Sequence, residues 1–267
     1  MGKRLGIIAG DGKFPVLLAE EINKNGYISV IVAHTGLTPQ YIEKTADKTF
    51  WIKVGQLSKL IEIFKSEGIT EAIMAGGISK RFMFSDIKPD LRALSLLIRL
   101  KDRKDDTILR AIAEELEKEG ITVNNATTYI ESILAEKEIL TKRKLSRDEK
   151  KDIDFGFDIA KEIGRLDIGQ CVIVKDRAVL AVEAIEGTNE AIRRGGALSN
   201  GGAVVVKVCK PGQDLRFDLP AVGPDTISCM KEVNAVVLAV ESGMTVMIDK
   251  DSMIKSADEA GITIVGI

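Results

Sequence analysis

Strand and helix patterns alternate along the first half of the chain, and this alternation constrains the fold more than any other feature of the sequence. Residues 4–10 form a short apolar run that ends in glycine, residues 15–26 have a helical pattern that begins with proline and ends with glycine, and residues 27–33 form a β-branched run. A strand–helix–strand unit of this kind builds a parallel sheet. Because the alternation continues to residue 134, we expect residues 1–135 to form a small doubly wound domain.

A charged segment, residues 136–152, separates this pattern from a different one. It is nearly free of apolar periodicity, which is typical of an exposed linker or a solvated helix, and we place the domain boundary there. Beyond it, two short strand patterns flank Asp176 and Arg177 as in a hairpin, and four further strand patterns are interrupted by two helical ones. The sequence therefore predicts a C-terminal domain of mixed α+β structure over residues 153–267.

The composition argues against several classes of function. A formal net charge of -2 and an aromatic content of 4% disfavour nucleic-acid binding, which needs a basic surface and stacking side chains. His34 is the only histidine, so a multi-histidine metal centre cannot form and any metal has to be held by oxygen ligands. At the end of a strand pattern, His34 is more typical of a structural or sugar-contacting residue than of a catalyst.

The cysteines and the N-terminus indicate a cytoplasmic protein. Cys171, Cys209 and Cys229 are far apart and lie beside apolar residues, as small buried side chains do in a reducing compartment. The N-terminal apolar run of about six residues is too short for a secretion signal or a membrane span.

Two glycine-containing loops follow strand patterns of the N-terminal domain. Ligands bind at the carboxyl ends of parallel strands, where the backbone N–H groups of such loops can bind a phosphate or a sugar hydroxyl. The first loop ends in proline rather than in the last glycine of the dinucleotide pattern G-x-G-x-x-G, which disfavours NAD binding. A plain tight turn and a substrate-binding loop both remain open. The candidate substrate-binding residues of the two loops are Gly10, Asp11, Gly12, Phe14, Gly76 and Gly77.

Residues 183–226 carry the densest group of acidic and basic side chains that could perform chemistry. Asp214, Arg216 and Asp218 have the alternate spacing of a strand and are expected on one face, where they either bind a ligand or pair on the surface. Carboxylates together with the cations of Lys207 and Arg216 suit a magnesium-bound phosphate ester.

A leucine-rich helical pattern with trailing cations covers residues 91–100. Such a helix either packs in the core or presents an apolar surface to acyl chains at a bilayer interface. The core position is the more typical one, and both interpretations remain open.

Several segments together resemble one known family. In chain order they are IIAGDGKFP, AGGISK, DDTILRAIAEELEKEGI, VLAVEAIEGTNEAIRR, KPGQDLRFDLPAVGPDTI and ITIVGI. They are similar to the UDP-2,3-diacylglucosamine pyrophosphatase family of lipid A biosynthesis, the type unrelated to calcineurin-like metallophosphoesterases. One departure is Lys80-Arg81-Phe82, where the resemblance implies an Arg-Pro-like turn.

The resemblance implies a Rossmann-like first domain, a distinctive second domain and substrate held between them. The implied activity is magnesium-dependent cleavage of UDP-2,3-diacylglucosamine to UMP and 2,3-diacylglucosamine 1-phosphate (lipid X), with Asp218 essential as a metal ligand or water-orienting base. Together with the side chains available, this gives catalytic candidates Asp218, Asp214 and Arg216, Mg²⁺ ligands Asp218 and Glu183, and further substrate-binding candidates Glu186, Gly187, Thr188 and Lys207.

The expected partners follow from that substrate. A lipid-linked UDP-sugar requires transient contact with the inner-membrane surface, so we expect a cytoplasmic protein peripheral to that membrane, and a homodimer is a candidate assembly. The alternative function is a non-catalytic nucleotide-sugar-binding or sensor protein that uses the same crevice, and only turnover distinguishes the two.

Overall fold

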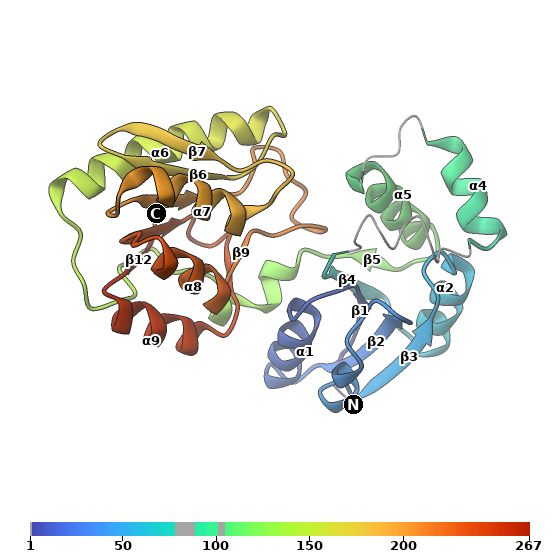
Figure 1. Ribbon diagram of the computed structural model, residues 1–267. Helices are drawn as coiled ribbons and strands as arrows, with labels where there is room; N and C mark the ends of the chain where they lie inside the picture. Colours follow the sequence, from blue (N-terminus) through green and yellow to red (C-terminus); the bar gives the residue numbers. More distant parts are fainter. Residues whose placement is uncertain (1, 78–88, 101–104) are drawn as a thin grey trace. The chain divides into compact units, whose positions relative to one another are not determined.

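The computed structural model describes residues 2–77, 89–100 and 105–267 (Figure 1). The chain forms two compact units, an N-terminal unit of Met1–Ile130 with Asp214–Asp218 and a C-terminal unit of Glu131–Gln213 with Leu219–Ile267. The C-terminal half therefore returns one short segment to the N-terminal unit. The Lys80-Arg81-Phe82 departure lies outside the described residues.

The N-terminal unit is built on a five-stranded sheet in which every pair of neighbours is parallel, in the order β3-β2-β1-β4-β5. The strands are β1 (Arg4–Ala9), β2 (Ile28–His34), β3 (Lys48–Ile52), β4 (Glu71–Ala75) and β5 (Thr122–Val123). The chain adds strands on one side of β1 and then on the other, so the strand order reverses between β1 and β4. Such a reversal creates a crevice outside the carboxyl ends of the two strands.

Helices of the N-terminal unit follow the predicted patterns. They are α1 (Phe14–Lys24), α2 (Leu57–Ser66), α4 (Leu91–Arg99) and α5 (Asp105–Lys118), with the 3-10 turns η1 (Gln40–Lys44) and η2 (Ala126–Tyr129). In α1, Pro15 stands in the first turn, where its missing N–H has no intrahelical partner to lose. In α2, Leu57, Leu60, Ile61 and Phe64 are all buried because their spacing puts them on one helical face.

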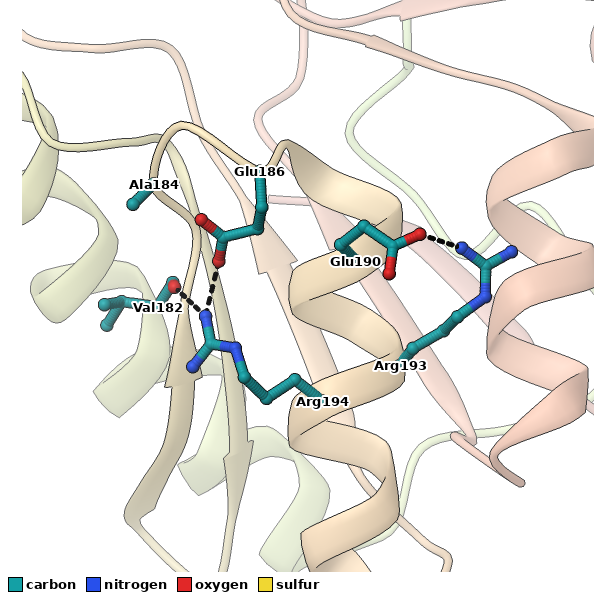
Figure 2. Close-up of a pocket in the computed structure, with 6 residues that line it drawn as sticks. All are labelled: Val182, Ala184, Glu186, Glu190, Arg193 and Arg194. Atoms are coloured by element: carbon teal, nitrogen blue, oxygen red, sulfur yellow. Dashed lines mark hydrogen bonds and ion pairs between the residues drawn. The ribbon is translucent and has the colours of Figure 1, made fainter.

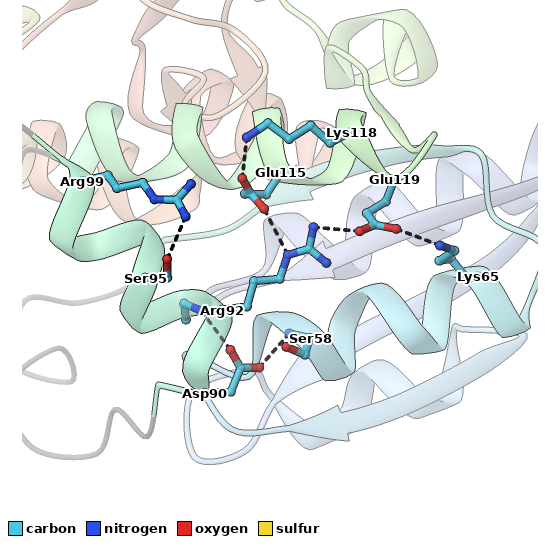
Figure 3. Close-up of polar contacts among 10 residues, drawn as sticks. Ser58, Lys65, Asp90, Arg92, Ser95, Arg99, Glu115, Lys118 and Glu119 are labelled. Carbon is cyan, nitrogen blue, oxygen red and sulfur yellow. Dashed lines mark hydrogen bonds and ion pairs between the residues drawn. The ribbon is translucent and has the colours of Figure 1, made fainter.

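Polar contacts hold α2, α4 and α5 together (Figure 3). The carboxylate of Asp90 caps α4 and also accepts a hydrogen bond from the backbone N–H of Ser58 in α2, at 2.7 Å. Arg92 of α4 lies between Glu115 (3.0 Å) in α5 and Glu119 (2.8 Å), just after that helix. Partly exposed pairs of this kind contribute fractions of a kcal/mol to about 1 kcal/mol each, so they orient the helices more than they stabilise the unit.

The C-terminal unit contains a mixed five-stranded sheet in the order β12-β10-β8-β6-β7. Strands β8, β10 and β12 are parallel, whereas β6 is antiparallel to both β8 and β7. The predicted hairpin is confirmed: Asp176 and Arg177 join β6 to β7, and both have positive φ angles (51° and 58°), as a two-residue turn between twisted strands requires. The strands are β6 (Cys171–Lys175), β7 (Ala178–Val182), β8 (Val204–Lys207), β10 (Val237–Val240) and β12 (Thr263–Gly266), with β9 (Ala221–Val222) and β11 (Val246–Met247) forming a separate parallel pair.

Helices cover both faces of this sheet (Figure 1). One face packs against α6 (Arg147–Arg165), and the other against α7 (Thr188–Ser199), α8 (Pro224–Glu232) and α9 (Lys250–Ala260). The predicted class, an α/β chain with a Rossmann-like parallel-sheet domain followed by a mixed domain, is confirmed.

The charged segment 136–152, for which an exposed linker or a solvated helix was expected, is grouped with the C-terminal unit. Ile139 forms a β-bridge with Val265, and α6 already begins at Arg147 behind a capping box made by Ser146. Asp152 is buried, and its carboxylate accepts hydrogen bonds from the two N–H groups of the β6–β7 turn, at 3.0 and 2.7 Å. The sequence did not reveal this role because most of the other charged side chains of the segment are exposed.

The end of the N-terminal unit and the start of the C-terminal unit carry η2 and a second 3-10 turn, η3 (Glu131–Ile133), and not a continuous α-helix. The chain then leaves helical geometry because Leu134 pairs with Val246 and the N–H of Ala135 donates to Thr245 at 2.9 Å. Tertiary pairing with β11 overrides the local helical preference.

Candidate functional site

The two glycine loops lie side by side at the point where the strand order of the N-terminal sheet reverses. They follow β1 and β4, and they are joined by backbone hydrogen bonds from Gly10 to Ala75 (2.7 Å) and from Asp11 to Gly77 (2.8 Å). A Cβ atom on Gly10 would lie 2.5 Å from the carbonyl oxygen of Gly77. This close approach requires glycine, so Gly10 joins the loops together instead of offering a free N–H group.

Other parts of the same loops remain accessible. Asp11, Gly12 and Gly77 are exposed, and among the described residues no atom lies within 4 Å of a Cβ built on either glycine. The Asp11 carboxylate accepts a hydrogen bond from the Gly12 N–H at 2.7 Å, and Phe14, half-buried, begins α1 directly after the loop. The open side of the loops can therefore contact a ligand, while Gly10 and Gly76 support it from behind.

His34 supports the end of β1. Its ring is buried, and Nδ1 donates to the carbonyl oxygen of Ala9 at 2.8 Å, an oxygen that also accepts from the Thr38 hydroxyl at 2.6 Å. Burial lowers the pKa of His34 and keeps the imidazole neutral at physiological pH. Of the two roles weighed for this histidine, the contacts support the structural one.

A second group of candidates comes together in the C-terminal unit. Lys207 Nζ, at the end of β8, donates to the Thr188 hydroxyl at 3.0 Å, and that hydroxyl donates to the Glu183 carboxylate at 2.7 Å. Glu183 and Lys207 are only 7% and 6% exposed. A buried carboxylate and a buried ammonium each cost free energy unless they have an opposite charge or hydrogen bonds nearby. Here the Thr188 hydroxyl forms hydrogen bonds with both and joins them into one cluster.

The cluster changes the chemistry of its surroundings. Complete burial raises the pKa of the Cys171 thiol to about 12, and the negative charge of Glu183 acts in the same direction against the opposing effect of Lys207. Cys171 therefore stays a neutral thiol and is a poor nucleophile at physiological pH.

Glu186 belongs to a different surface. Its carboxylate pairs with Arg194 at 2.5 Å on an open hollow of about 790 Å³ (Figure 2). Arg194 also donates to the carbonyl oxygen of Val182, and its neighbour Arg193 binds Glu190. Gly187 stands between the hollow and the Glu183 cluster with φ +84°, a left-handed conformation that glycine adopts without strain.

Asp214, Arg216 and Asp218 do not lie on a strand, so the strand expected from their alternate spacing is wrong. They form a helix-like turn in which the N–H of Phe217 donates to the Asp214 carbonyl oxygen at 3.0 Å. Arg216 binds the Asp214 carboxylate through two nitrogens, at 2.9 and 2.8 Å, and this ion pair lowers the pKa of Asp214. Glycine at position 212, with a φ of +76°, turns the chain just before this segment, where strand spacing assumes extended residues.

Asp218 follows this pair as an exposed residue, and the next residue, Leu219, already belongs to the other unit. Within residues 2–77, 89–100 and 105–267, no three His, Cys, Asp or Glu side chains are arranged to hold a metal ion. Mg²⁺ nevertheless needs few protein ligands, because it keeps waters and takes oxygens from substrate phosphates. An exposed carboxylate such as Asp218 fits this chemistry, whereas Glu183 fits it poorly because both of its oxygens already accept hydrogen bonds.

Three further residues that contact these candidates were not singled out in the sequence. Glu117 of α5 contacts Arg216 at 3.3 Å, and Arg110 of the same helix lies 3.5 Å from the Asp214 carboxylate. Gln170 donates its backbone N–H to Glu183, and its buried Oε1 has no hydrogen-bond partner in the described part of the chain. None of these positions carries a local pattern, because each acquires its role through a tertiary contact.

The fold and these clusters define a two-domain α/β protein whose N-terminal unit has the doubly wound topology of nucleotide-binding domains, with glycine loops at its ligand crevice. Models of the LpxI N-terminal domain and the LpxI C-terminal domain match residues 4–133 and 136–265. The chain belongs to the LpxI family, which confirms the resemblance inferred from its sequence segments.

A curated relative supports the same assignment. The protein named UDP-2,3-diacylglucosamine pyrophosphatase LpxI from Caulobacter vibrioides is 31% identical over 276 residues, which cover 99% of this chain and 98% of the relative. Among solved structures, CobK precorrin-6A reductase matches with a TM-score of 0.32 at 11% identity, covering 99% of this chain and 87% of its own. Glycinamide-RNase-transformylase T from Mycobacterium tuberculosis matches with a TM-score of 0.26 at 9% identity, covering 68% and 44%.

Proposed function

We propose that this chain hydrolyses the pyrophosphate bond of UDP-2,3-diacylglucosamine, releasing UMP and 2,3-diacylglucosamine 1-phosphate in lipid A biosynthesis. The observation that carries the proposal is the match to the LpxI relative over 99% of the chain, with both LpxI domains present. A protein that shares only one domain with an enzyme can lose its activity, but here the whole architecture is retained.

The proposed binding element in the N-terminal unit is the open side of the glycine loops. The exposed backbone at Gly12 and Gly77 can approach a ligand closely because neither position carries a side chain. The Asp11 carboxylate repels phosphate and favours a hydroxyl, so we assign this side of the crevice to a sugar or ribose hydroxyl group.

The reacting phosphates need a positive charge beside them and an oriented water molecule. Asp218 is our candidate both for holding the Mg²⁺ that would provide this charge and for orienting the water. Its carboxylate would hold Mg²⁺ together with phosphate oxygens of the substrate, and the bound ion would neutralise charge on the leaving phosphate. Asp218 would also orient or deprotonate the attacking water. Lys207 and Thr188 do not contact the phosphates in this proposal. The Thr188 hydroxyl donates to Glu183 and accepts from Lys207, and these hydrogen bonds hold the start of α7 in place.

The activity is tested by mixing the purified protein with UDP-2,3-diacylglucosamine and Mg²⁺ and measuring UMP. We expect steady UMP release by the wild type and a loss of about 1,000-fold or more for Asp218→Ala, since both a charge and a proton acceptor are removed. Asp225→Asn is the matched control, because Asp225 is an exposed acid in the first turn of α8. Substrate that stays intact with the wild type would refute the enzyme and favour the binding protein.

For the lipid part of the substrate we propose contact with an anionic membrane surface through α4. Leu91 (87% exposed), Leu94 (45%) and Ile98 (75%) lie on one side of this helix, while Ala93 and Leu96 are buried. The buried face of α4 fits the core interpretation of this leucine-rich pattern, and the exposed face is the one that we propose for the membrane. Arg99 ends the helix, and its charge complements acidic lipid headgroups. In the described part of the chain, no helix has the length and hydropathy needed to cross a bilayer.

Sedimentation with vesicles that contain anionic lipid tests this contact. Leu91→Ser combined with Ile98→Ser should reduce vesicle binding several-fold, whereas Leu198→Ser, at a 67% exposed position on α7, should not. Equal binding of both variants and the wild type would rule out α4 as the membrane surface.

A further inference from the structure

The segment Asp214–Asp218 is attached to the N-terminal unit although its neighbours on both sides belong to the C-terminal unit. Phe217 is 8% exposed and is part of the apolar core that also contains Leu96 of α4 and Leu116 of α5. In the sequence the segment lies between β8 and β9 of the C-terminal unit, so its membership in the N-terminal unit comes from tertiary contacts such as the packing of Phe217.

Ion pairs and a cation–π contact reinforce the burial of Phe217. The Arg216 guanidinium lies 4.9 Å from the centre of the Phe217 ring and binds the Asp214 carboxylate with two hydrogen bonds. On α5, Glu117 contacts Arg216 at 3.3 Å and Arg110 contacts Asp214 at 3.5 Å. Two charges on one helix thus match two charges on the segment.

The chain just before the segment is fixed to the C-terminal unit. The Glu241 carboxylate accepts a hydrogen bond from the backbone N–H of Cys209 at 2.8 Å and forms an ion pair with Lys161 of α6 at 2.7 Å. Lys210 binds Asp167 at 2.8 Å. The chain is consequently held by one unit up to about residue 210 and by the other from residue 214, where the Phe217 contact and the ion pairs of Asp214 and Arg216 hold the segment that ends at Asp218.

We propose that Phe217, with the Asp214–Arg216 pair, forms an anchor that fixes Asp218 to the N-terminal unit, so that these three are positioning residues for hydrolysis and not groups that touch the phosphates. The catalytic consequence rests on the proposed function. The anchor itself does not, because it can be observed without turnover.

The anchor is tested with Phe217→Ala, Phe217→Leu and Arg216→Lys, and with Phe155→Ala as a size-matched control on α6, where Phe155 is half-buried in the C-terminal unit. Hydrogen exchange reports on the amides of Phe217 and Asp218, which donate to the Asp214 carbonyl oxygen at 3.0 and 3.4 Å. Fluorescence of the single tryptophan, Trp51 in β3, reports whether the N-terminal unit stays folded.

We expect Phe217→Ala to accelerate exchange at both amides with Trp51 emission unchanged, and to lower kcat by about 100-fold with KM changed less than about 3-fold, as misplacement of a catalytic group does. Phe217→Leu should restore most of kcat, and Arg216→Lys, which loses the bidentate pair, should lower kcat by about 10-fold. Phe155→Ala should leave exchange at these amides unchanged.

Unchanged exchange, or an unchanged kcat, in both Phe217→Ala and Arg216→Lys would overturn the proposal. If Phe217→Ala alone unfolds the N-terminal unit, Arg216→Lys decides. If the wild type hydrolyses no substrate, the proposed function fails while exchange at the two amides still decides whether the anchor exists.

Discussion

The glycine loops of the N-terminal unit and the Glu183 cluster of the C-terminal unit use opposite means to build a site. The loops bring two backbones within hydrogen-bond distance and leave Asp11, Gly12 and Gly77 exposed, with almost no charged side chains involved. The cluster gathers a carboxylate, a hydroxyl and an ammonium; the two charged residues are buried, Thr188 is half-buried, and all three are hydrogen-bonded to one another through the hydroxyl. Reactive residue types in a sequence therefore mark buried structural networks as readily as they mark binding surfaces.

Removing one member of the cluster should have the largest effect on stability. Lys207→Met leaves the buried Glu183 carboxylate without its compensating charge, and we expect a loss of about 3–5 kcal/mol in the free energy of unfolding at pH 7. Urea denaturation followed by circular dichroism measures this loss. The double variant Lys207→Met, Glu183→Gln should recover a large part of it; equal losses in the single and double variants would show that the two charges do not compensate each other.

Adding a methyl group to the glycine loops should have a smaller effect that depends on the position. Gly10→Ala places a Cβ against the carbonyl oxygen of Gly77, and we expect it to destabilise the protein by about 2 kcal/mol. The Cβ of Gly77→Ala meets no atom of the described residues within 4 Å, and the substitution should change the unfolding free energy by less than about 1 kcal/mol. Similar losses for the two variants would contradict the division of the loops into a joined side and an open side.

Removing the Asp214–Arg216 ion pair should have the smallest effect on the free energy of unfolding. The pH dependence of this effect shows whether the charge of the Asp214 carboxylate causes it. The folded state lowers the pKa of Asp214 below 3.8, mainly through its hydrogen bonds with Arg216, so the pair's contribution is fully present above the unfolded pKa. It is lost as the pH falls through the folded pKa. At pH 7 we expect Asp214→Asn to cost about 1–2 kcal/mol.

Urea midpoints of the wild type and Asp214→Asn, measured from pH 7 down to pH 3, follow this contribution. The difference between the two proteins should shrink below about pH 4, because protonation then removes the same charge from the wild type. A difference that stays constant over this range would mean that the carboxylate charge contributes nothing.

Local patterns predicted the elements that local forces determine. The β1–α1–β2 unit and the hairpin at Asp176 and Arg177 were predictable because apolar periodicity and turn chemistry act over a few residues. Glu183, Thr188 and Lys207 were singled out as chemically active residues, and the structure brings them together. The hydrogen bonds that join the three residues could not be predicted, since they depend on the distance between β8 and the start of α7.

The largest error concerns Asp214–Asp218, where alternation of charged and apolar residues suggested a strand. The segment instead turns, because Phe217 is buried in a core formed by residues more than 90 positions earlier, and no local pattern records such a partner. The buried position of Asp152 in the charged stretch was not predicted for a related reason. In the sequence, one buried hydrogen-bond acceptor cannot be distinguished from the solvated acidic residues around it.

³¹P NMR of UDP-2,3-diacylglucosamine incubated with the protein and Mg²⁺ tests both the proposed hydrolysis and the proposed role of Asp218. With the wild type we expect the two pyrophosphate resonances to disappear and two phosphomonoester resonances to replace them, whereas with Asp218→Ala the pyrophosphate resonances should persist. Persistence with the wild type, or equal turnover by Asp218→Ala, would contradict the proposal.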